Sequence, residues 1–166
     1  MGIFLIMTKN FCIKEVLDKH IILEVLLEEI MMPILSMYLA SFIYFIDFEV
    51  LKYILLVGYL VPCIVEIERK IRCKEDEEEG ARIYTAVFGI PKTTAILTIF
   101  ETILILVLYA ILARAFLFPI IIVYIVLTLI NILFMIEQRK KYAKDVEISA
   151  NAFIFISYLS MGLLLL

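Results

Sequence analysis

One charged stretch, residues 66–80 (EIERKIRCKEDEEEG), holds the side chains best suited to chemistry, with four cations and seven carboxylates in fifteen residues. Magnesium ions in proteins are held by one or two carboxylates together with waters and substrate phosphates. Arginine and lysine neutralise the remaining phosphate charge, and nearby helix ends add backbone donors. The stretch therefore suits a magnesium–diphosphate site. Composition leaves a second interpretation open, in which the charges of a solvated loop only maintain membrane topology.

The elements that must position this stretch are strongly apolar. Of the 166 residues, 64% are hydrophobic, and the mean hydropathy is +1.07. A soluble domain is roughly 45–50% apolar, so these values argue against a soluble enzyme. The apolar blocks cover residues 21–46, 50–67, 93–113, 116–136 and 149–166. Each block is near the ~20 residues that cross a bilayer, and lipid requires their backbone to be helical.

The sequence thus predicts an all-α fold, a polytopic membrane helix bundle formed by a single domain over residues 1–166. About five transmembrane helices fit this length. Residues 10–19 (NFCIKEVLDK) mix apolar and charged side chains and predict a short N-terminal interfacial helix. The lipid bilayer is therefore an expected partner, whereas a net charge of −3 argues against nucleic acid. Three cysteines without CxxC spacing and a single histidine argue against zinc.

The distribution of basic residues predicts the orientation. Thirteen of the fifteen lysines and arginines lie in the N-terminal segment and in the loops 68–92 and 137–148, and the other two are Lys52 and Arg114. By the positive-inside rule, the N-terminus and both loops face the cytoplasm, and the C-terminus lies outside the cell membrane.

The order of residues over 66–89 (EIERKIRCKEDEEEGARIYTAVFG) resembles the second acidic motif of UbiA-family intramembrane prenyltransferases. The matching residues are Glu66, Arg69, Lys70, Ile71, Arg72, Asp76, Glu77, Gly80, Tyr84, Thr85 and Gly89. Residues 10–33 look like the family's interfacial segment and following helix, and residues 143–162 look like its last helix. The family's first motif, of the NDxxDxxxD type, is absent, because Asn10, Asn131 and Asn151 all lack the following aspartates. The chain therefore resembles only the C-terminal half of the family.

The resemblance implies a function and a set of site residues. The function is transfer of a prenyl group from a prenyl diphosphate to a lipophilic acceptor, once a separately encoded N-terminal half completes the site. By the same resemblance, Glu66, Asp76 and Glu77 are metal ligands for Mg²⁺, and Arg69, Lys70 and Arg72 bind the diphosphate. Metals and cations would stabilise the leaving diphosphate in a water-poor pocket. Alone, the chain is expected to be inactive.

Two carboxylates within apolar blocks are further candidates for lining a pocket, Glu28 and Glu101. Carboxylates at bilayer depth usually face a bundle interior or a cavity. For Glu28, the headgroup zone near Lys19 is an alternative position. Glu101 lies about 12 Å into its helix, where it should bond to a neighbouring helix, line a pocket or be protonated. Two other functions remain open, a non-catalytic membrane protein (a relic or an interaction module) and, more remotely, a small transporter.

Overall fold

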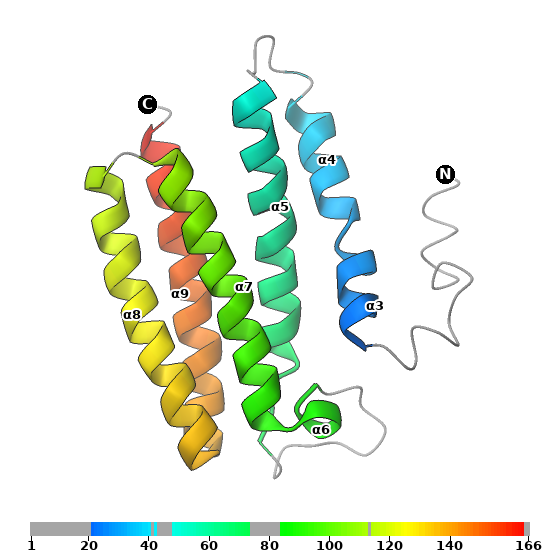
Figure 1. Cartoon of the computed structure of the whole chain (residues 1–166), viewed down its shortest axis with the longest axis vertical. Helices are drawn as coiled ribbons and strands as arrows, with labels where there is room; N and C mark the ends of the chain where they lie inside the picture. The colour runs from blue at the N-terminus through cyan, green and yellow to red at the C-terminus, as the bar shows by residue number, and fades with distance from the viewer. Residues whose placement is uncertain (1–20, 41, 43–47, 74–83, 113, 165–166) are drawn as a thin grey trace.

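A computed structural model describes residues 21–40, 42, 48–73, 84–112 and 114–164, and these form helices and no strands (Figure 1). The helices are α3 (Ile21–Glu28), α4 (Met31–Ala40), α5 (Phe48–Arg69), α6 (Tyr84–Phe88), α7 (Ile90–Ile111), α8 (Arg114–Glu137) and α9 (Lys140–Leu164). The predicted interfacial helix over 10–19 lies outside the described residues, as do residues 74–83 of the charged loop.

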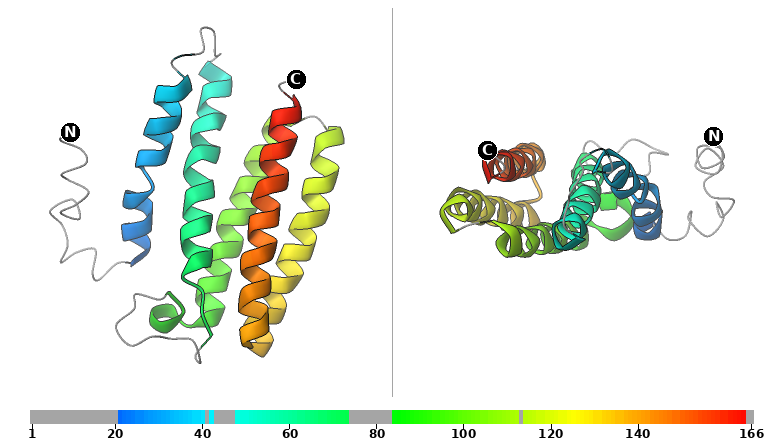
Figure 2. Two further views of the ribbon diagram at one scale, coloured as in Figure 1. Left: turned by 180° about the vertical axis from the view of Figure 1, so that it is seen from behind. Right: turned by 90° about the horizontal axis from the view of Figure 1, so that it is seen from above.

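The long helices α5, α7, α8 and α9 run alternately up and down and pack into a bundle, with α8 against α9 and α7 between α5 and α8 (Figure 2). Helices α3 and α4 lie along the outer side of α5. The bundle interior is apolar, and side chains such as Ile64, Leu97, Leu127 and Phe153 are fully buried. Such antiparallel packing brings the end of α5, the start of α7 and the α8–α9 connection to the same end of the molecule.

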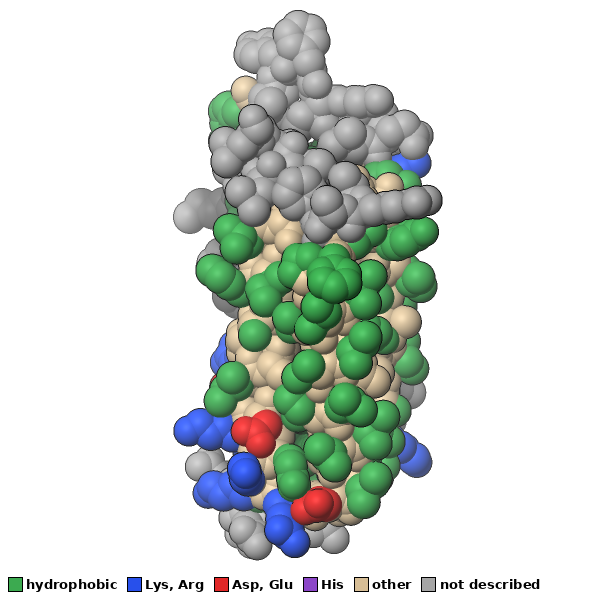
Figure 3. All heavy atoms as spheres, turned by 90° about the vertical axis from the view of Figure 1, so that its left-hand side faces the viewer, with side chains coloured by type: hydrophobic (Ala, Val, Ile, Leu, Met, Phe, Trp, Pro, Cys, Tyr) green, Lys and Arg blue, Asp and Glu red, His purple; other side chains and the backbone are tan. Residues whose placement is uncertain are grey.

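The outside of this bundle is also apolar. Leu106 on α7, Phe118 on α8 and Phe155 on α9 each leave more than 60% of their surface exposed, and hydrophobic side chains are spread over the described part of the face shown in Figure 3. Such exposure is unfavourable in water but not in lipid. Within the described residues, Ile90–Ile111 and Leu117–Glu137 are long and apolar enough to cross a membrane. The protein is thus an all-helical chain with two candidate membrane spans.

The first apolar block differs from the single helix predicted over 21–46, because it breaks after Glu28. The Glu29 amide still donates to the Val25 carbonyl at 3.0 Å, and the Met32 amide then donates to the Glu29 carbonyl at 3.1 Å. Pro33 explains the break, because it lacks an amide hydrogen and its ring displaces the carbonyl four residues earlier, that of Glu29. The result is two short helices in place of one continuous helix.

Both loops predicted to be cytoplasmic contain more helix than the sequence indicates. Helix α5 extends to Arg69, α6 forms within the loop 68–92, and α7 begins at Ile90. In the segment 137–148, only Gln138 and Arg139 separate α8 from α9. Charged residues end an apolar block without ending the helix, since only the part of a helix that lies in lipid must have apolar side chains.

Candidate functional site

The C-terminal turn of α5 brings three of the predicted site residues together. The Lys70 Nζ lies 2.6 Å from Glu66 Oε1, and the Arg69 Nη1 lies 3.7 Å from Glu66 Oε2. These pairs follow from helix geometry, because residues three and four apart share a face. The Glu66 side chain is 15% exposed and that of Arg69 is 67% exposed. Glu66 thus holds Lys70 in place, while Arg69 keeps most of its surface open.

Helix α6 docks against this turn through two residues of the motif. Lys70 Nζ donates to the Tyr84 hydroxyl at 3.5 Å and lies 5.1 Å from the centre of its ring. The Thr85 hydroxyl accepts the backbone N–H of Arg72 at 3.2 Å. The sequence assigned no role to either residue. Both are buried, and their contacts show that they anchor α6 to the end of α5.

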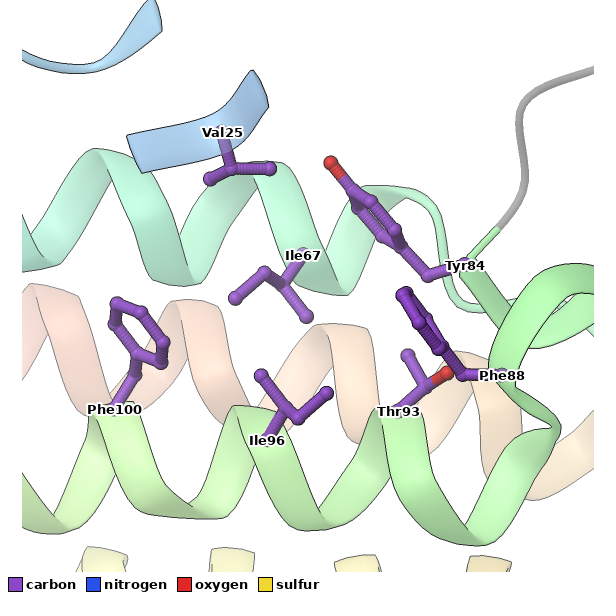
Figure 4. A pocket seen from close by; sticks show the side chains of 7 residues that line it. All are labelled: Val25, Ile67, Tyr84, Phe88, Thr93, Ile96 and Phe100. Atoms are coloured by element: carbon purple, nitrogen blue, oxygen red, sulfur yellow. The ribbon is translucent and has the colours of Figure 1, made fainter. Parts of the chain in front are cut away.

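An apolar pocket adjoins the charged turn and shares Tyr84 with it (Figure 4). Its lining consists of Val25, Ile67, Tyr84, Phe88, Thr93, Ile96 and Phe100. In Figure 4 the rings of Tyr84 and Phe88 lie side by side, and Thr93, Ile96 and Phe100 follow one another along α7. The cavity measures about 10 Å³, which is about the room that one water molecule needs. Charged and apolar surfaces therefore meet at Tyr84, around a small void.

Gly89 sets the connection between α6 and α7. It has φ 79° and ψ 157°, a conformation that is essentially limited to glycine. The Gly89 amide caps α6 by donating to the Thr85 carbonyl at 2.9 Å, and its own carbonyl accepts the Thr93 amide at 3.1 Å. Pro91 follows in the first turn of α7, where its missing amide hydrogen costs nothing. The last glycine of the motif thus allows α6 to fold back beside the pocket.

Arg72 lies apart from the other two cations that the resemblance assigned to a diphosphate. Its guanidinium Nη1 donates to the Ile71 carbonyl at 2.9 Å, and its side chain lines a second cavity together with residues of α9. Helix α5 ends at Arg69, so helical spacing no longer decides which way residue 72 points. The structure therefore brings Arg69 and Lys70 to Glu66 and places Arg72 elsewhere.

The remaining predicted metal ligands, Asp76 and Glu77, lie outside the described residues. Among the residues that are described, no three histidine, cysteine, aspartate or glutamate side chains are grouped to hold a metal ion. Glu66 is the single assigned ligand in this part of the chain, and its carboxylate is already paired with Lys70. Magnesium prefers six oxygen ligands in octahedral geometry. The described residues by themselves do not fit a magnesium site.

Of the two candidate pocket-lining carboxylates, Glu101 is the better defined. It is fully buried, and the Asn131 amide donates to its Oε2 at 2.9 Å and to the Thr98 hydroxyl at 3.1 Å. This bond joins α7 to α8, so Glu101 follows the first of the three alternatives, contact with a neighbouring helix. Glu28, at the end of α3, is half-buried. Neither carboxylate lines the apolar pocket.

Sequence reasoning missed Glu68. It is 1% exposed, and neither of its oxygens has a hydrogen-bond partner among the described residues. Burial raises the pKa of Glu68 to about 8, and the charges of Glu147 and Glu101 add to the shift, while Asn151 opposes it. In the structure, residue 68 continues the helical face of buried Val57, Val61 and Ile64. The sequence does not single out this face, because residues 53–65 are almost all apolar.

Fold and site together define an all-helical bundle with an apolar exterior and a charged end that opens beside an apolar pocket. No protein-family model, no curated protein and no solved structure matches this chain. Only the chain's own residues therefore indicate its function.

Proposed function

We propose that the chain is the C-terminal half of a UbiA-like intramembrane prenyltransferase. Completed by a separately encoded N-terminal half, it would transfer a prenyl group from a prenyl diphosphate to a lipophilic acceptor. The observation that supports this function best is the meeting of the Glu66–Lys70 turn and the apolar pocket at Tyr84. A prenyl diphosphate has the same two parts, an anionic head and an apolar chain.

The side chains around Tyr84 suit the two parts of this substrate. Arg69 and Lys70 offer charge-assisted hydrogen bonds, which are the strong ones for phosphate oxygens. In the reaction, they would stabilise the charge that develops on the leaving diphosphate. The apolar chain would follow Phe88, Ile96 and Phe100. Because the cavity holds only about one water, α3 and α6 must move away from α7 before a prenyl chain enters.

Magnesium belongs to this proposal through Asp76 and Glu77, together with Glu66. These three carboxylates would hold the ion, which would neutralise phosphate charge. For Glu66 to coordinate it, the 2.6 Å contact with Lys70 has to open. The same opening would leave the Lys70 ammonium available to bind the diphosphate.

The proposed topology has five spans, with the charged end of the bundle in the cytoplasm and the C-terminus outside. The ends of α5 and α8 and the starts of α7 and α9 lie together in the structure (Figure 1). Arg69, Lys92 and Lys140 are among the basic residues near these ends. Basic residues near the ends of spans favour the cytoplasmic side, which supports this orientation.

One observation favours a second candidate, a non-catalytic membrane protein that keeps the half-fold as an interaction module. The Glu66–Lys70 pair and the Tyr84 contact close the charged turn on itself, and the adjoining cavity is only water-sized. Such a closed arrangement is sufficient to stabilise a helix end without any ligand.

A binding experiment separates the two candidates. The chain is reconstituted in nanodiscs together with its N-terminal half and titrated with geranylgeranyl diphosphate, with and without Mg²⁺. Lys70→Gln should weaken binding by about 10–100-fold, because a charge-assisted hydrogen bond contributes about 1.5–3 kcal/mol. Asp76→Ala with Glu77→Ala should remove the dependence on Mg²⁺.

The matched control is Lys92→Gln, an exposed lysine at the start of α7 that lines neither cavity. It should bind as the wild type does. Geranylgeraniol, which lacks the diphosphate, should bind all variants equally. Absence of diphosphate binding by the wild-type pair would favour the non-catalytic module, and equal affinity in Lys70→Gln would remove Lys70 from the site.

A further inference from the structure

A second cavity of about 330 Å³ lies between the end of α5 and the first turns of α9. Its lining consists of Ile71, Arg72, Lys140, Lys141, Ala143, Lys144, Asp145 and Glu147, and we refer to it as the basic pocket. It shares no lining residue with the apolar pocket, and neither Glu66 nor Lys70 lines it.

The charge of the basic pocket favours an anion. Four of its lining residues are cations and two are carboxylates, which leaves an excess of two positive charges. Lys141 and Lys144 are exposed and Arg72 is half-buried, so their charged groups are accessible without unfolding. The pocket also lies at the N-terminus of the 25-residue helix α9, where the helix dipole adds positive potential.

The backbone holds this arrangement in place from both sides. The first turn of α9 begins directly at the pocket, where the Arg139 carbonyl accepts the amides of Tyr142 and Ala143 at 3.0 and 3.3 Å. On the opposite wall, Ile71 is 1% exposed, and the Thr85 hydroxyl fixes the amide of Arg72. The cations thus come from two walls of the pocket, Arg72 from the segment that follows α5 and the three lysines from the first turns of α9.

The surroundings of the pocket identify the kind of anion. Ile136, at the end of α8, is 72% exposed, and Ile148, on α9 just beyond the pocket, is 58% exposed. Figure 3 shows lysine and arginine side chains gathered at the lower end of the bundle, directly below a surface of hydrophobic side chains. A soluble phosphate would gain nothing from these apolar neighbours, whereas a phospholipid has an acyl chain to lay against them.

We propose that the basic pocket binds the phosphate headgroup of an anionic phospholipid in the cytoplasmic leaflet, with the acyl chains lying along the exposed apolar surfaces of α8 and α9. Lysine ammonium groups supply point charges, and the Arg72 guanidinium supplies a two-pronged donor for phosphate oxygens. Basic pockets between helices at the cytoplasmic surface suit such headgroups. The bound lipid would link α5 to α9 at the charged end of the bundle.

The test measures lipid retention by the full chain in nanodiscs of phosphatidylcholine with or without phosphatidylglycerol, by native mass spectrometry after transfer to detergent. The wild type should retain phosphatidylglycerol in preference to phosphatidylcholine. Lys144→Gln should lower this preference about fivefold, and Lys141→Gln with Lys144→Gln about 25-fold, since each cation near an anionic surface contributes about equally. Replacing both lysines by arginine should preserve it.

Lys92→Gln is the control of equal charge, because Lys92 is exposed at the same end of the bundle but lies outside the pocket. Equal loss in Lys92→Gln would show that diffuse surface charge, and not the pocket, attracts the lipid, and would overturn the proposal. So would displacement of the lipid by millimolar inorganic phosphate, which would identify a site for a soluble anion. Circular dichroism of each variant confirms that the helices are intact, and the arginine variant tests the pocket even if the glutamine variants unfold.

Discussion

Glu68 is a described side chain whose surroundings disfavour its charge. Its carboxyl group is buried, both oxygens lack hydrogen-bond partners among the described residues, and two further carboxylates, Glu147 and Glu101, lie near enough to disfavour ionisation. The side-chain amide of Asn151 opposes this effect, although it also donates to the Glu147 carbonyl at 2.9 Å. At neutral pH the folded chain therefore favours the protonated acid at this position.

We predict that thermal stability in detergent falls as the pH rises from about 4.5 to about 8. The pKa of Glu68 is raised from 4.5 to about 8 on folding, so the folded state binds more protons than the unfolded state throughout this interval. Stability must then decrease with pH between the two values, and the full loss is present above the folded pKa. Unfolding temperatures measured across this range give the slope.

The variant Glu68→Gln should reduce this slope and raise the unfolding temperature above pH 8. It keeps the shape of the side chain, removes the ionisation and supplies a donor for neighbouring oxygens, a change worth about 1–3 kcal/mol. Glu137→Gln is the control, because Glu137 is exposed and paired with Arg139 at 3.3 Å. If Glu68→Gln retained the wild-type slope, another group would be responsible for it.

The bond between Asn131 and Glu101 predicts a loss of stability when one of its partners is removed. Asn131→Ala should destabilise the bundle by about 1–3 kcal/mol, because it leaves a fully buried carboxylate without its donor. The double variant with Glu101→Leu should recover most of this loss, since replacing both polar partners by apolar groups is nearly neutral. Thermal unfolding of the two single variants and the double variant measures the coupling. Additive effects would mean that the bond does not contribute.

These residues show which side-chain contacts can be predicted from the sequence. The contact of Glu66 with Lys70 follows directly from their spacing of four on a helix. The burial of Glu68 does not, because residues 53–65 of α5 are almost all apolar and single out no face. The direction of Arg72 does not follow, because it lies beyond the last turn of α5 and depends on how α6 folds back. The sequence does not predict the partner of Glu101 either. Its pairing with Asn131 depends on how α7 and α8 are rotated relative to each other.

At the level of the elements, α6 depends on a single backbone conformation. Gly89 adopts φ 79° and ψ 157°, and only this geometry lets the chain cap α6 and enter α7 at once. The apolar blocks predict the long helices well, because lipid imposes helical structure on any apolar span. They do not predict α6, which has only five residues and is held by Tyr84 and Thr85.

We therefore predict that Gly89→Ala displaces α6 without disturbing the long helices. A Cβ at this position would meet no closer atom than Pro91 Cδ, at 3.9 Å, so the cost is backbone strain of about 1–3 kcal/mol. Far-ultraviolet circular dichroism should stay within the wild-type range, while binding of geranylgeranyl diphosphate to the completed enzyme should weaken. Unchanged binding together with unchanged stability would show that α6 does not position the site.

For the whole molecule, the apolar exterior is the property that the sequence predicts most directly. Exposed side chains such as Tyr109, Phe118 and Phe155 lie on three different helices, so the apolar surface surrounds the bundle and is not confined to one patch. A docking site would be local, whereas a surrounding apolar surface is what a bilayer requires. The first turns of α9 carry Lys140, Lys144 and Asp145. In the proposed topology these charged turns lie at the membrane surface.

The proposed five-span topology predicts which positions a membrane-impermeant maleimide can reach in intact cells. In a chain whose native cysteines are replaced, Arg114→Cys should be labelled from outside, because residue 114 begins α8 at the end of the bundle opposite the basic pocket. Lys144→Cys, in the basic pocket, should react only after the cells are lysed. The two ends of a helix that crosses the membrane once lie on opposite sides of it. The positive-inside rule therefore predicts the labelling of both cysteine variants together. Labelling of Lys144→Cys in intact cells, with Arg114→Cys protected, would invert the orientation and place the charged turn of α5 outside, where a prenyl diphosphate made in the cytoplasm would not reach it.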